Sequence, residues 1–194
     1  MIEAVEFIIR HEGSVPHLYK DTRGNVTCGV GFLVPDVRTL QTFDWQPSDA
    51  AALRDWYKIL PLPGAHRVSF YARHCEAVIT EDEIARVLTD KLAAFTERLQ
   101  EDWDLDKHPP TVQVALLDMA YNLGVGGLGR YLKLGAALDK RDYAEAATEC
   151  SRRGVPERRN QETAELFLAA AEQHQSADGS VSRVLTPESD EQSS

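Results

Sequence analysis

The sequence predicts a mainly helical α+β domain with two lobes and a small sheet near its N-terminus. Three observations support this prediction. A short amphipathic helix precedes a glycine-rich, β-favouring stretch at residues 18–34. A long amphipathic pattern, able to join two lobes, covers residues 80–101, and further helical patterns fill residues 102–175. The chain has 194 residues, of which 43% are apolar, and this is enough for one domain with a substantial core.

The first predicted helix covers residues 2–10. Its apolar side chains recur at helical spacing, and Gly13 offers a stop just beyond them. Glu12 therefore falls at the C-terminal end of this helix. Short β-favouring pieces follow, separated by a turn at residues 22–25 and loosened by Gly29 and Gly31. These pieces predict a small hairpin sheet.

Residues 35–79 complete the predicted N-terminal lobe of residues 1–79, but they are harder to interpret. Prolines and one glycine interrupt the segment at Pro35, Pro47, Pro61, Pro63 and Gly64. Between these interruptions, one helix is predicted from about Ser48 to Leu60. We treat the rest of the segment as an unassigned insertion.

The connecting helix at 80–101 begins with a capping box, in which Thr80 caps an amide and Glu83 reaches back. Residues 111–123 are apolar nearly all round, as expected for a helix at the centre of a lobe. Further helices are predicted at 131–138, 142–151 and 160–173, and the polar tail of residues 176–194 is predicted to be disordered. Residues 1–175 thus form a single predicted domain.

Composition excludes several classes of function. Twenty-one basic and 31 acidic side chains give a formal charge of −10, which disfavours binding to nucleic acid and anionic lipid. No apolar run reaches the roughly 18 residues of a membrane span. The N-terminus is acidic where a secretory signal would be basic, so we expect synthesis in the cytoplasm without a signal peptide.

Cysteine and histidine spacing gives no indication of a metal site, and we expect neither a metal nor a cofactor. The three cysteines lie far apart, at positions 28, 75 and 150. We predict buried free thiols, with one long-range disulfide as the alternative. The six histidines are scattered. His11 beside Glu12 is interpreted as a helix-end residue.

Glu12, Asp21 and Thr27 are the residues best suited to chemistry. Breaking a glycosidic bond generally requires two carboxyl groups, one to protonate the departing oxygen and one to act at the anomeric carbon. A helix end and a hairpin would present Glu12 and Asp21 from different sides of a cleft. The Thr27 hydroxyl can donate and accept, so it could orient a water molecule beside Asp21.

A longer string of residues resembles the signature of the phage-type (T4-like) lysozymes, a muramidase family of glycoside hydrolases. The string consists of Glu12-Gly13, Leu18-Tyr19-Lys20-Asp21-Thr22, Gly24, Thr27, Gly29 and Gly31. Two later segments also resemble the family, namely Ala120-Tyr121-Asn122-Leu123-Gly124 and Gly154-Val155-Pro156-Glu157-Arg158-Arg159 with Glu162 and Leu166-Phe167. The resemblance covers roughly residues 2–34 and 79–170.

This resemblance implies a lysozyme-like two-lobed fold and a role for each residue. Glu12 would be the general acid, Asp21 would activate the hydrolytic water, and Thr27 would hold that water. Substrate-binding positions would be Gly29, Gly31, Asn122 and Arg159, with the Arg159 guanidinium near Glu12. The implied reaction is cleavage of the β-1,4 bond between N-acetylmuramic acid and N-acetylglucosamine, by inversion.

The chain also departs from the family. Phe32 stands where many relatives have a histidine, so we expect altered packing around the hairpin. Residues 35–79 match none of the family's motifs, and their aromatic residues Trp45, Trp56 and Tyr57 would fill the core or, alternatively, form sugar-stacking platforms. The acidic charge removes long-range attraction to peptidoglycan. Arg130, Lys133 and Arg158 would form surface salt bridges or, alternatively, a local basic patch.

Two other functions remain open at this point. A lytic transglycosylase would use the sugar's own hydroxyl in place of water, and a non-catalytic module would only bind the wall. The expected partner is bacterial peptidoglycan, with an immunity protein or a delivery partner if the chain is an antibacterial effector rather than a phage endolysin. We expect a monomer that acts in the periplasm or on the wall of the target cell.

Overall fold

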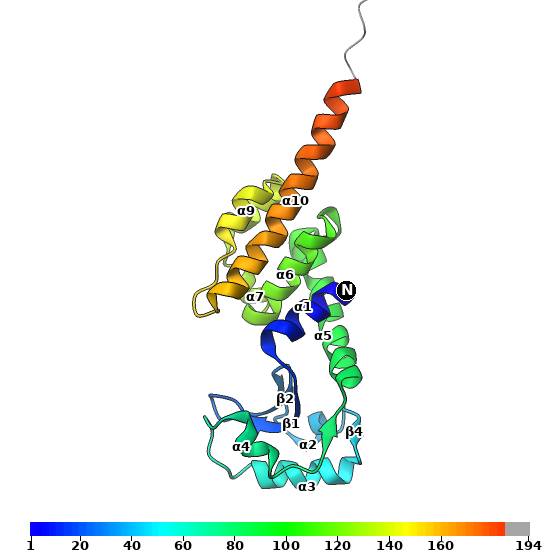
Figure 1. Ribbon diagram of the computed structural model, residues 1–194, viewed down its shortest axis with the longest axis vertical. Helices are drawn as coiled ribbons and strands as arrows, with labels where there is room; N and C mark the ends of the chain where they lie inside the picture. Colours follow the sequence, from blue (N-terminus) through cyan, green and yellow to red (C-terminus); the bar gives the residue numbers. More distant parts are fainter. Residues whose placement is uncertain (185–194) are drawn as a thin grey trace, which may run out of the picture. The chain divides into compact units, whose positions relative to one another are not determined.

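A computed structural model describes the backbone of residues 1–184 and the side chains of residues 1–176. The chain divides into two compact units, Met1–Phe95 and a second one from Thr96 onward. Helices dominate, with small antiparallel sheets in the first unit (Figure 1). This confirms the predicted mainly helical α+β class. No helix among residues 1–184 combines the length and apolarity needed to cross a membrane.

The first unit begins with α1 (Ile2–Glu12) and a three-stranded antiparallel sheet of β1 (Val15–Lys20), β2 (Val26–Gly29) and β3 (Phe32–Leu33). Gly13 ends the helix with a φ of 75°, a conformation in which a side chain would be strained. In the sheet, Tyr19 lies opposite Thr27 and Thr27 lies opposite Leu33. The predicted helix and hairpin sheet are therefore both present.

Phe32 packs inside this unit. Its side chain is buried, and its ring centroid lies 5.9 Å from that of Phe43. A Cβ built on Gly29 would lie only 2.6 Å from a ring carbon of Phe32, so position 29 has no room for a side chain. Phe32 and Gly29 thus form one packing arrangement beneath the sheet.

The segment of residues 35–79 forms its own small set of elements. In chain order these are α2 (Val37–Leu40), β4 (Trp45–Gln46), α3 (Asp49–Ile59), α4 (Val68–Ala72) and β5 (Val78–Ile79). The predicted helix at 48–60 is confirmed as α3, whose first turn is capped by the Ser48 hydroxyl. Strands β4 and β5 pair antiparallel, which brings residues 45–46 beside the end of the segment at residues 78–79.

Side-chain hydrogen bonds attach this segment to the sheet and close it on itself. Lys20 on β1 donates from Nζ to the carbonyl oxygens of Leu60 and Leu62, at 2.7 Å each. These bonds satisfy carbonyl groups at and just beyond the C-terminal end of α3. Within the segment, the buried Asp55 carboxylate accepts from the amide of Ala77 at 2.7 Å.

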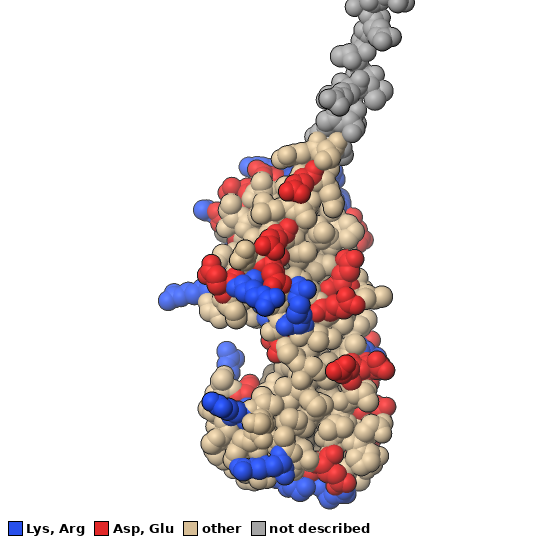
Figure 2. All heavy atoms as spheres, viewed as in Figure 1, with Lys and Arg blue, Asp and Glu red and all other residues tan. Residues whose placement is uncertain are grey.

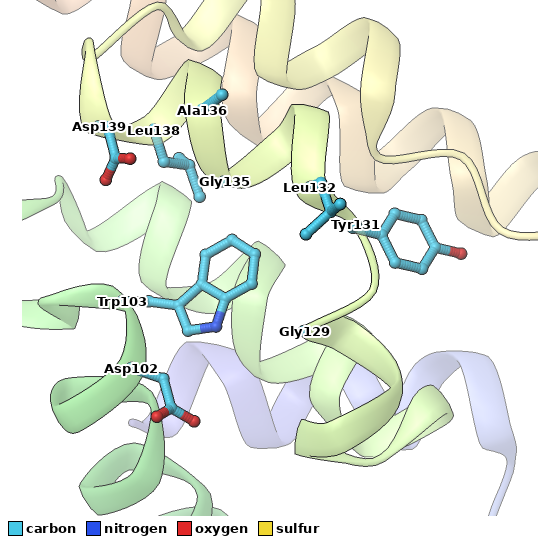
Figure 3. Close-up of a pocket in the computed structure, with 9 residues that line it drawn as sticks. All are labelled: Asp102, Trp103, Gly129, Tyr131, Leu132, Gly135, Ala136, Leu138 and Asp139. Atoms are coloured by element: carbon cyan, nitrogen blue, oxygen red, sulfur yellow. The ribbon is translucent and has the colours of Figure 1, made fainter.

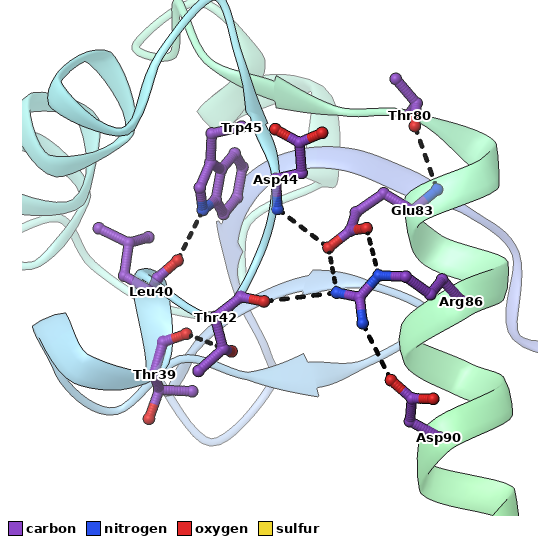
Figure 4. Close-up of polar contacts among 9 residues, drawn as sticks. All are labelled: Thr39, Leu40, Thr42, Asp44, Trp45, Thr80, Glu83, Arg86 and Asp90. Carbon is purple, nitrogen blue, oxygen red and sulfur yellow. Dashed lines mark hydrogen bonds and ion pairs between the residues drawn. The ribbon is translucent and has the colours of Figure 1, made fainter.

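The start of α5 (Glu81–Trp103) shows a capping pattern that differs from the predicted one (Figure 4). The Thr80 hydroxyl accepts from the Glu83 amide at 3.1 Å, as predicted. The Glu83 carboxylate does not reach back to its own helix end; it accepts from the Asp44 amide and from Arg86. Arg86 lies one turn further along and offers charge-assisted bonds, which are stronger than a neutral capping contact. These bonds hold the pKa of Glu83 below its usual range.

The regular secondary structure of the second unit's described residues is entirely helical, and the unit contains the end of α5. Its central helix α6 (Pro110–Leu123) buries residues on every side, as predicted: Val112, Val114, Ala115, Leu116, Leu117, Asp118, Met119 and Ala120. The other elements are η1 (Leu105–Lys107), α7 (Val125–Leu128), α8 (Leu132–Asp139), α9 (Tyr143–Glu149) and α10 (Glu157–Val184).

Helix α10 corrects the predicted start of the tail. We expected disorder from Ser176, but the helix continues to Val184. Adding residues to an existing helix requires no new nucleus, so a polar segment can continue a helix that it could not begin. The remainder of the predicted tail, residues 185–194, lies outside the described residues.

Two of the three cysteines and two of the three aromatic residues considered as sugar-stacking platforms are buried. Cys28 and Cys150 are buried thiols, and Cys75 is half-buried. Trp45 and Trp56 are also buried, and each indole nitrogen donates to a backbone carbonyl. Tyr57 is the exception, because 60% of it is exposed.

Candidate active site

Glu12 is the last residue of α1, and its side chain is exposed. Gly13 turns the chain directly after it into β1, so the helix end and the sheet are joined by a short connection. Lys91 on α5 lies within electrostatic range of Glu12. Burial lowers the pKa of Lys91, and the negative charge of Glu12 partly opposes this effect. Lys91 was missed in the sequence because only the fold brings it near residue 12.

Asp21 begins the turn between β1 and β2, and its carboxylate is held by the turn itself. Oδ1 accepts from the amides of Arg23 and Asn25, at 2.9 and 2.8 Å. Oδ2 accepts from the Asn25 side chain at 3.0 Å. Burial would raise the pKa of Asp21, but the bonds from Asn25 and Arg23 together outweigh it, so the pKa is lowered. Asp21 is therefore a fixed, ionised carboxylate at neutral pH.

Thr27 lies on β2 and is connected to Asp21 through Asn25. Its hydroxyl donates to the Asn25 carbonyl oxygen at 3.0 Å, and only 2% of the residue is exposed. Asn25 thus donates to the aspartate and accepts from the threonine. The sequence predicts only a turn at Asn25, because nothing in its residue type distinguishes a linking asparagine from any other turn asparagine.

The pKa of Tyr19 is affected by both candidate carboxyl groups. Its pKa is raised to about 12, mainly by burial and to a lesser degree by negative charge at Cys28, Asp21 and Glu12. A phenol with so high a pKa stays neutral at physiological pH. Asp21 and Glu12 both contribute to this raised pKa, so each carboxyl group lies within electrostatic range of Tyr19.

The two glycines predicted to admit a sugar differ from each other. Gly31 is exposed and has a φ of 90°. Gly29 is buried, and Phe32 fills the space where its side chain would be. The absence of a side chain at Gly29 therefore leaves room for the Phe32 ring, and its role in sugar approach stays a prediction.

Gly64, in the insertion, lies close to the turn that holds Asp21. A Cβ built on Gly64 would lie 3.0 Å from the Gly24 Cα and 3.6 Å from the Asp21 carbonyl oxygen. Gly24 itself has a φ of 85°. The loop after α3 therefore lies directly against the turn that holds Asp21.

Arg159 and Asn122 belong to the second unit. Arg159 donates from Nε and Nη2 to Oδ1 of Asp118, at 3.0 and 2.7 Å. The other Asp118 oxygen accepts from Thr163 and forms an ion pair with Arg152, at 3.1 and 2.8 Å. Arg159 is thus a member of a buried cluster between α6 and α10, a partnership the sequence did not indicate. Asn122 is exposed near the end of α6.

The basic residues considered for a patch behave mainly as surface partners. Lys133 pairs with Glu149 at 3.2 Å, and Arg158 pairs with Glu162 at 2.7 Å. Such exposed pairs contribute little to stability. The space-filling view shows acidic and basic groups close together over the visible face (Figure 2). Within the described residues, no three His, Cys, Asp or Glu side chains gather in a way that could hold a metal ion.

The second unit also has a hollow of about 420 Å³, beside the Trp103 indole (Figure 3). Asp102, Tyr131 and Leu132 are among its lining residues. None of the predicted site residues lines it. It is therefore distinct from the site expected from the sequence.

The features above define a mainly helical α+β protein that carries an exposed glutamate and a fixed aspartate beside a small sheet. A family model described as phage lysozyme matches residues 65–167, which is more than half of the chain. The chain belongs to this phage lysozyme family.

A curated relative agrees with this assignment. The chain is 23% identical over 154 residues to "Probable T4-type lysozyme 1" of Dictyostelium discoideum, covering 77% of this chain and 82% of the relative. Family membership supports a muramidase-type peptidoglycan hydrolase. The family match begins at residue 65, so Glu12, Asp21 and Thr27 lie outside it.

Proposed function

We propose that this protein is an N-acetylmuramidase that hydrolyses the β-1,4 bond between N-acetylmuramic acid and N-acetylglucosamine. The observation that carries the proposal is the Asp21 turn, where three hydrogen bonds hold an ionised carboxylate beside the sheet. A carboxylate prepared in this way suits the activation of water. Glu12, at the end of the preceding helix, supplies the second carboxyl group that the reaction requires.

In the proposed reaction, Glu12 gives its proton to the glycosidic oxygen as the bond to the anomeric carbon breaks. A water molecule forms the new bond to that carbon and loses a proton to Asp21. This division of roles gives inversion at the anomeric carbon. In inverting sites, the two carboxyl groups are about 6.5–9.5 Å apart, which leaves room for the water.

Thr27 would orient this water as an acceptor. Its hydroxyl hydrogen is already donated to the Asn25 carbonyl, so the oxygen has lone pairs left for a hydrogen from water. A water that donates one hydrogen to Asp21 and the other to Thr27 turns a lone pair toward the sugar. Thr27 would therefore assist the attack without exchanging a proton.

Peptidoglycan contacts are proposed at Gly29, Gly31, Asn122 and Arg159, of which Gly31 and Asn122 are exposed and the other two are buried. The Asp118 carboxylate holds two donors of the Arg159 guanidinium, which supports a fixed orientation for this residue. We propose that the protein acts as a monomer on the wall of a bacterial cell, either as a phage endolysin or as an antibacterial effector. As an effector it would be delivered by a partner and restrained by an immunity protein.

The test is clearing of purified peptidoglycan by the Glu12→Gln protein. We expect loss of clearing with an unchanged circular-dichroism melt, while Glu6→Gln on the same helix, also exposed, stays active. Clearing by Glu12→Gln at the wild-type rate would refute the proposal. Mass spectrometry of the wild-type products should show reducing ends. Anhydro ends would indicate transglycosylation, and binding to sacculi without soluble fragments would indicate a non-catalytic module.

A further inference from the structure

The insertion carries a hollow between α2 and α3 that the proposed reaction does not use. Its volume is about 600 Å³, and its lining residues are Asp36, Val37, Arg38, Trp56, Tyr57 and Leu60. Apolar side chains form most of this lining, while Asp36 and Arg38 add one acidic and one basic group. A mainly apolar hollow with a few polar groups is the usual form of a small-ligand site.

Tyr57 gives this hollow an exposed aromatic ring that is held in place. The ring is 60% exposed, yet its centroid lies 5.3 Å from that of Trp56 at an interplanar angle of 80°. Trp56 is itself buried, and its Nε1 donates to the Val34 carbonyl oxygen at 3.1 Å. An edge-to-face contact with a fixed partner restricts the tyrosine ring, so binding a ligand would cost little side-chain entropy.

The polar groups beside the ring are also suited to recognition. Asp36 caps α2, with Oδ1 accepting from the amide and the hydroxyl of Thr39 at 2.8 and 2.9 Å. These bonds lower its pKa, so the carboxylate is ionised and has further lone pairs to offer. Arg38 follows two residues later and is exposed, so its guanidinium can bind a carboxylate in bidentate geometry.

We propose that this hollow is a second peptidoglycan-binding subsite, which holds the glycan strand away from the hydrolytic residues. The apolar face of one sugar ring would lie on Tyr57, and Asp36 would accept from sugar hydroxyls. Arg38 would bind a carboxylate of muramic acid or of the attached peptide. The inference rests on the proposed function for the identity of its ligand, since the same polymer is the substrate.

An anionic membrane surface fits this hollow less well. Exposed apolar residues near Arg and Lys can attach a protein to lipid, and Leu60 and Tyr57 are both exposed. However, these two residues line a hollow rather than a convex face. Asp36 at the same place would repel an anionic headgroup, whereas it suits the hydroxyl groups of a sugar.

Binding should be measured in the Glu12→Gln background, so that the polymer stays intact. The probes are purified sacculi in a sedimentation assay, and two soluble ligands in titration calorimetry: a tetramer of N-acetylglucosamine and a muramyl-peptide tetrasaccharide. We expect Tyr57→Ala to weaken binding to all three by roughly tenfold, the effect of about 1.4 kcal/mol. Tyr57→Phe should keep most of the affinity, because it keeps the ring.

The Arg38→Ala variant tests the contribution of the polar contacts to binding separately from that of the stacking on Tyr57. It should weaken binding to the muramyl-peptide ligand and leave binding to the N-acetylglucosamine tetramer unchanged, because only the former has carboxylates. Leu168→Ala is the matched control, since Leu168 is an exposed apolar residue on α10. It should bind all probes as the parent does.

Two outcomes would overturn this inference. One is parental affinity of Tyr57→Ala for all three glycan probes. The other is an effect of Tyr57→Ala only on binding to vesicles of phosphatidylglycerol and phosphatidylcholine. Both are distinguishable from failure of the proposed function, which is measured by clearing with Glu12→Gln alone. In the catalytically intact protein, Tyr57→Ala should raise KM on sacculi and leave kcat unchanged.

Discussion

Two aspartates, one in each unit, are each held by several donors but in opposite surroundings. Asp21 lies at a partly exposed turn, and its partners are two backbone amides and one asparagine side chain. Asp118 is fully buried, and its partners are two guanidinium groups and the Thr163 hydroxyl. The first arrangement presents a carboxylate to solvent, whereas the second neutralises charge inside a helical core.

The difference shows how surroundings assign a role to the same chemical group. The donors of Asp21 come from its own turn, so its charge stabilises that turn and compensates no buried cation. Asp118 compensates Arg152 and Arg159, which are nearly inaccessible to water. Removing it would leave two buried cations uncompensated. We therefore expect loss of stability from changes at Asp118 and loss of activity from changes at Asp21.

The largest expected effect is on the stability of the folded protein. Asp118→Ala should lower the free energy of unfolding by about 3–5 kcal/mol, because it breaks a buried ion cluster from one side. Urea unfolding followed by circular dichroism measures this change. The exposed Asp139 in the same unit is the control, and Asp139→Ala should stay within about 0.5 kcal/mol of wild type. Equal stability of the two variants would contradict the comparison.

Asp21→Asn should have the opposite effect to Asp118→Ala, with a large loss of activity and a small loss of stability. The amide keeps an acceptor for the turn but cannot take a proton from water, so activity should fall by about a hundredfold or more. The free energy of unfolding should fall by about 1 kcal/mol, because the bond from the Asn25 side chain to Oδ2 is lost while the two amide bonds to Oδ1 can remain. Initial rates of peptidoglycan clearing and a urea titration on the same preparation give both values. A variant that loses stability in proportion to activity would place Asp21 with Asp118 as a structural residue.

Thr27→Ala should have a smaller effect on activity, about tenfold, because the hydroxyl orients water without exchanging a proton. Thr27→Ser keeps the hydroxyl and should retain most of the rate. The clearing assay at saturating substrate compares the two variants. If Thr27→Ser were as impaired as Thr27→Ala, the methyl group and its packing would matter rather than the hydroxyl.

The smallest expected effect is a shift of the acid limb of the pH profile. Asn25→Ala removes one donor to Asp21, so the pKa of Asp21 should rise toward its ordinary value. Because the folded-state pKa is depressed, the ionised form stabilises the fold above the unfolded pKa. This contribution is lost as the pH falls through the folded value. In Asn25→Ala, Asp21 would take up a proton at a higher pH than in the wild type. Since protonated Asp21 cannot accept a proton from water, activity should begin to fall at a higher pH.

Arg23→Ala is the control for this shift, because Arg23 donates to Asp21 through its backbone amide, which the substitution keeps. Its charge is the smallest of the influences on the pKa of Asp21. Clearing rates measured across the acidic range should show a smaller displacement for Arg23→Ala than for Asn25→Ala. The reverse order would contradict the assignment of Asn25 as the main donor.

The sequence predicted features that depend on neighbouring residues. Helical spacing and Gly13 placed Glu12 at a helix end, and the turn glycines placed Asp21 and Thr27 in a hairpin. By contrast, the bond between Arg159 and Asp118 joins residues 41 positions apart, and no local pattern encodes it. No local pattern relates Lys91 to Glu12 either, because only the fold brings the two residues within electrostatic range.

The two shortest strands and the end of α10 were also beyond prediction. Strands β4 and β5 contain two residues each, too few for alternation to be visible, and they exist because they pair with each other. Glu83 exchanged its predicted capping contact for Arg86, a choice that depends on the competing partner. Helix α10 extends beyond its predicted end at residue 173, because the preceding turns allow it to continue without a new nucleus.

The close approach of Gly64 to the Asp21 turn has a consequence for the history of this chain. A side chain at position 64 would press on Gly24 and, through it, on the residues that hold Asp21. A side chain at position 64 would therefore require an accommodating change in the turn. Among relatives, small residues at these two positions should vary in concert, and a chimaera given a different insertion should require the matching turn from the same donor.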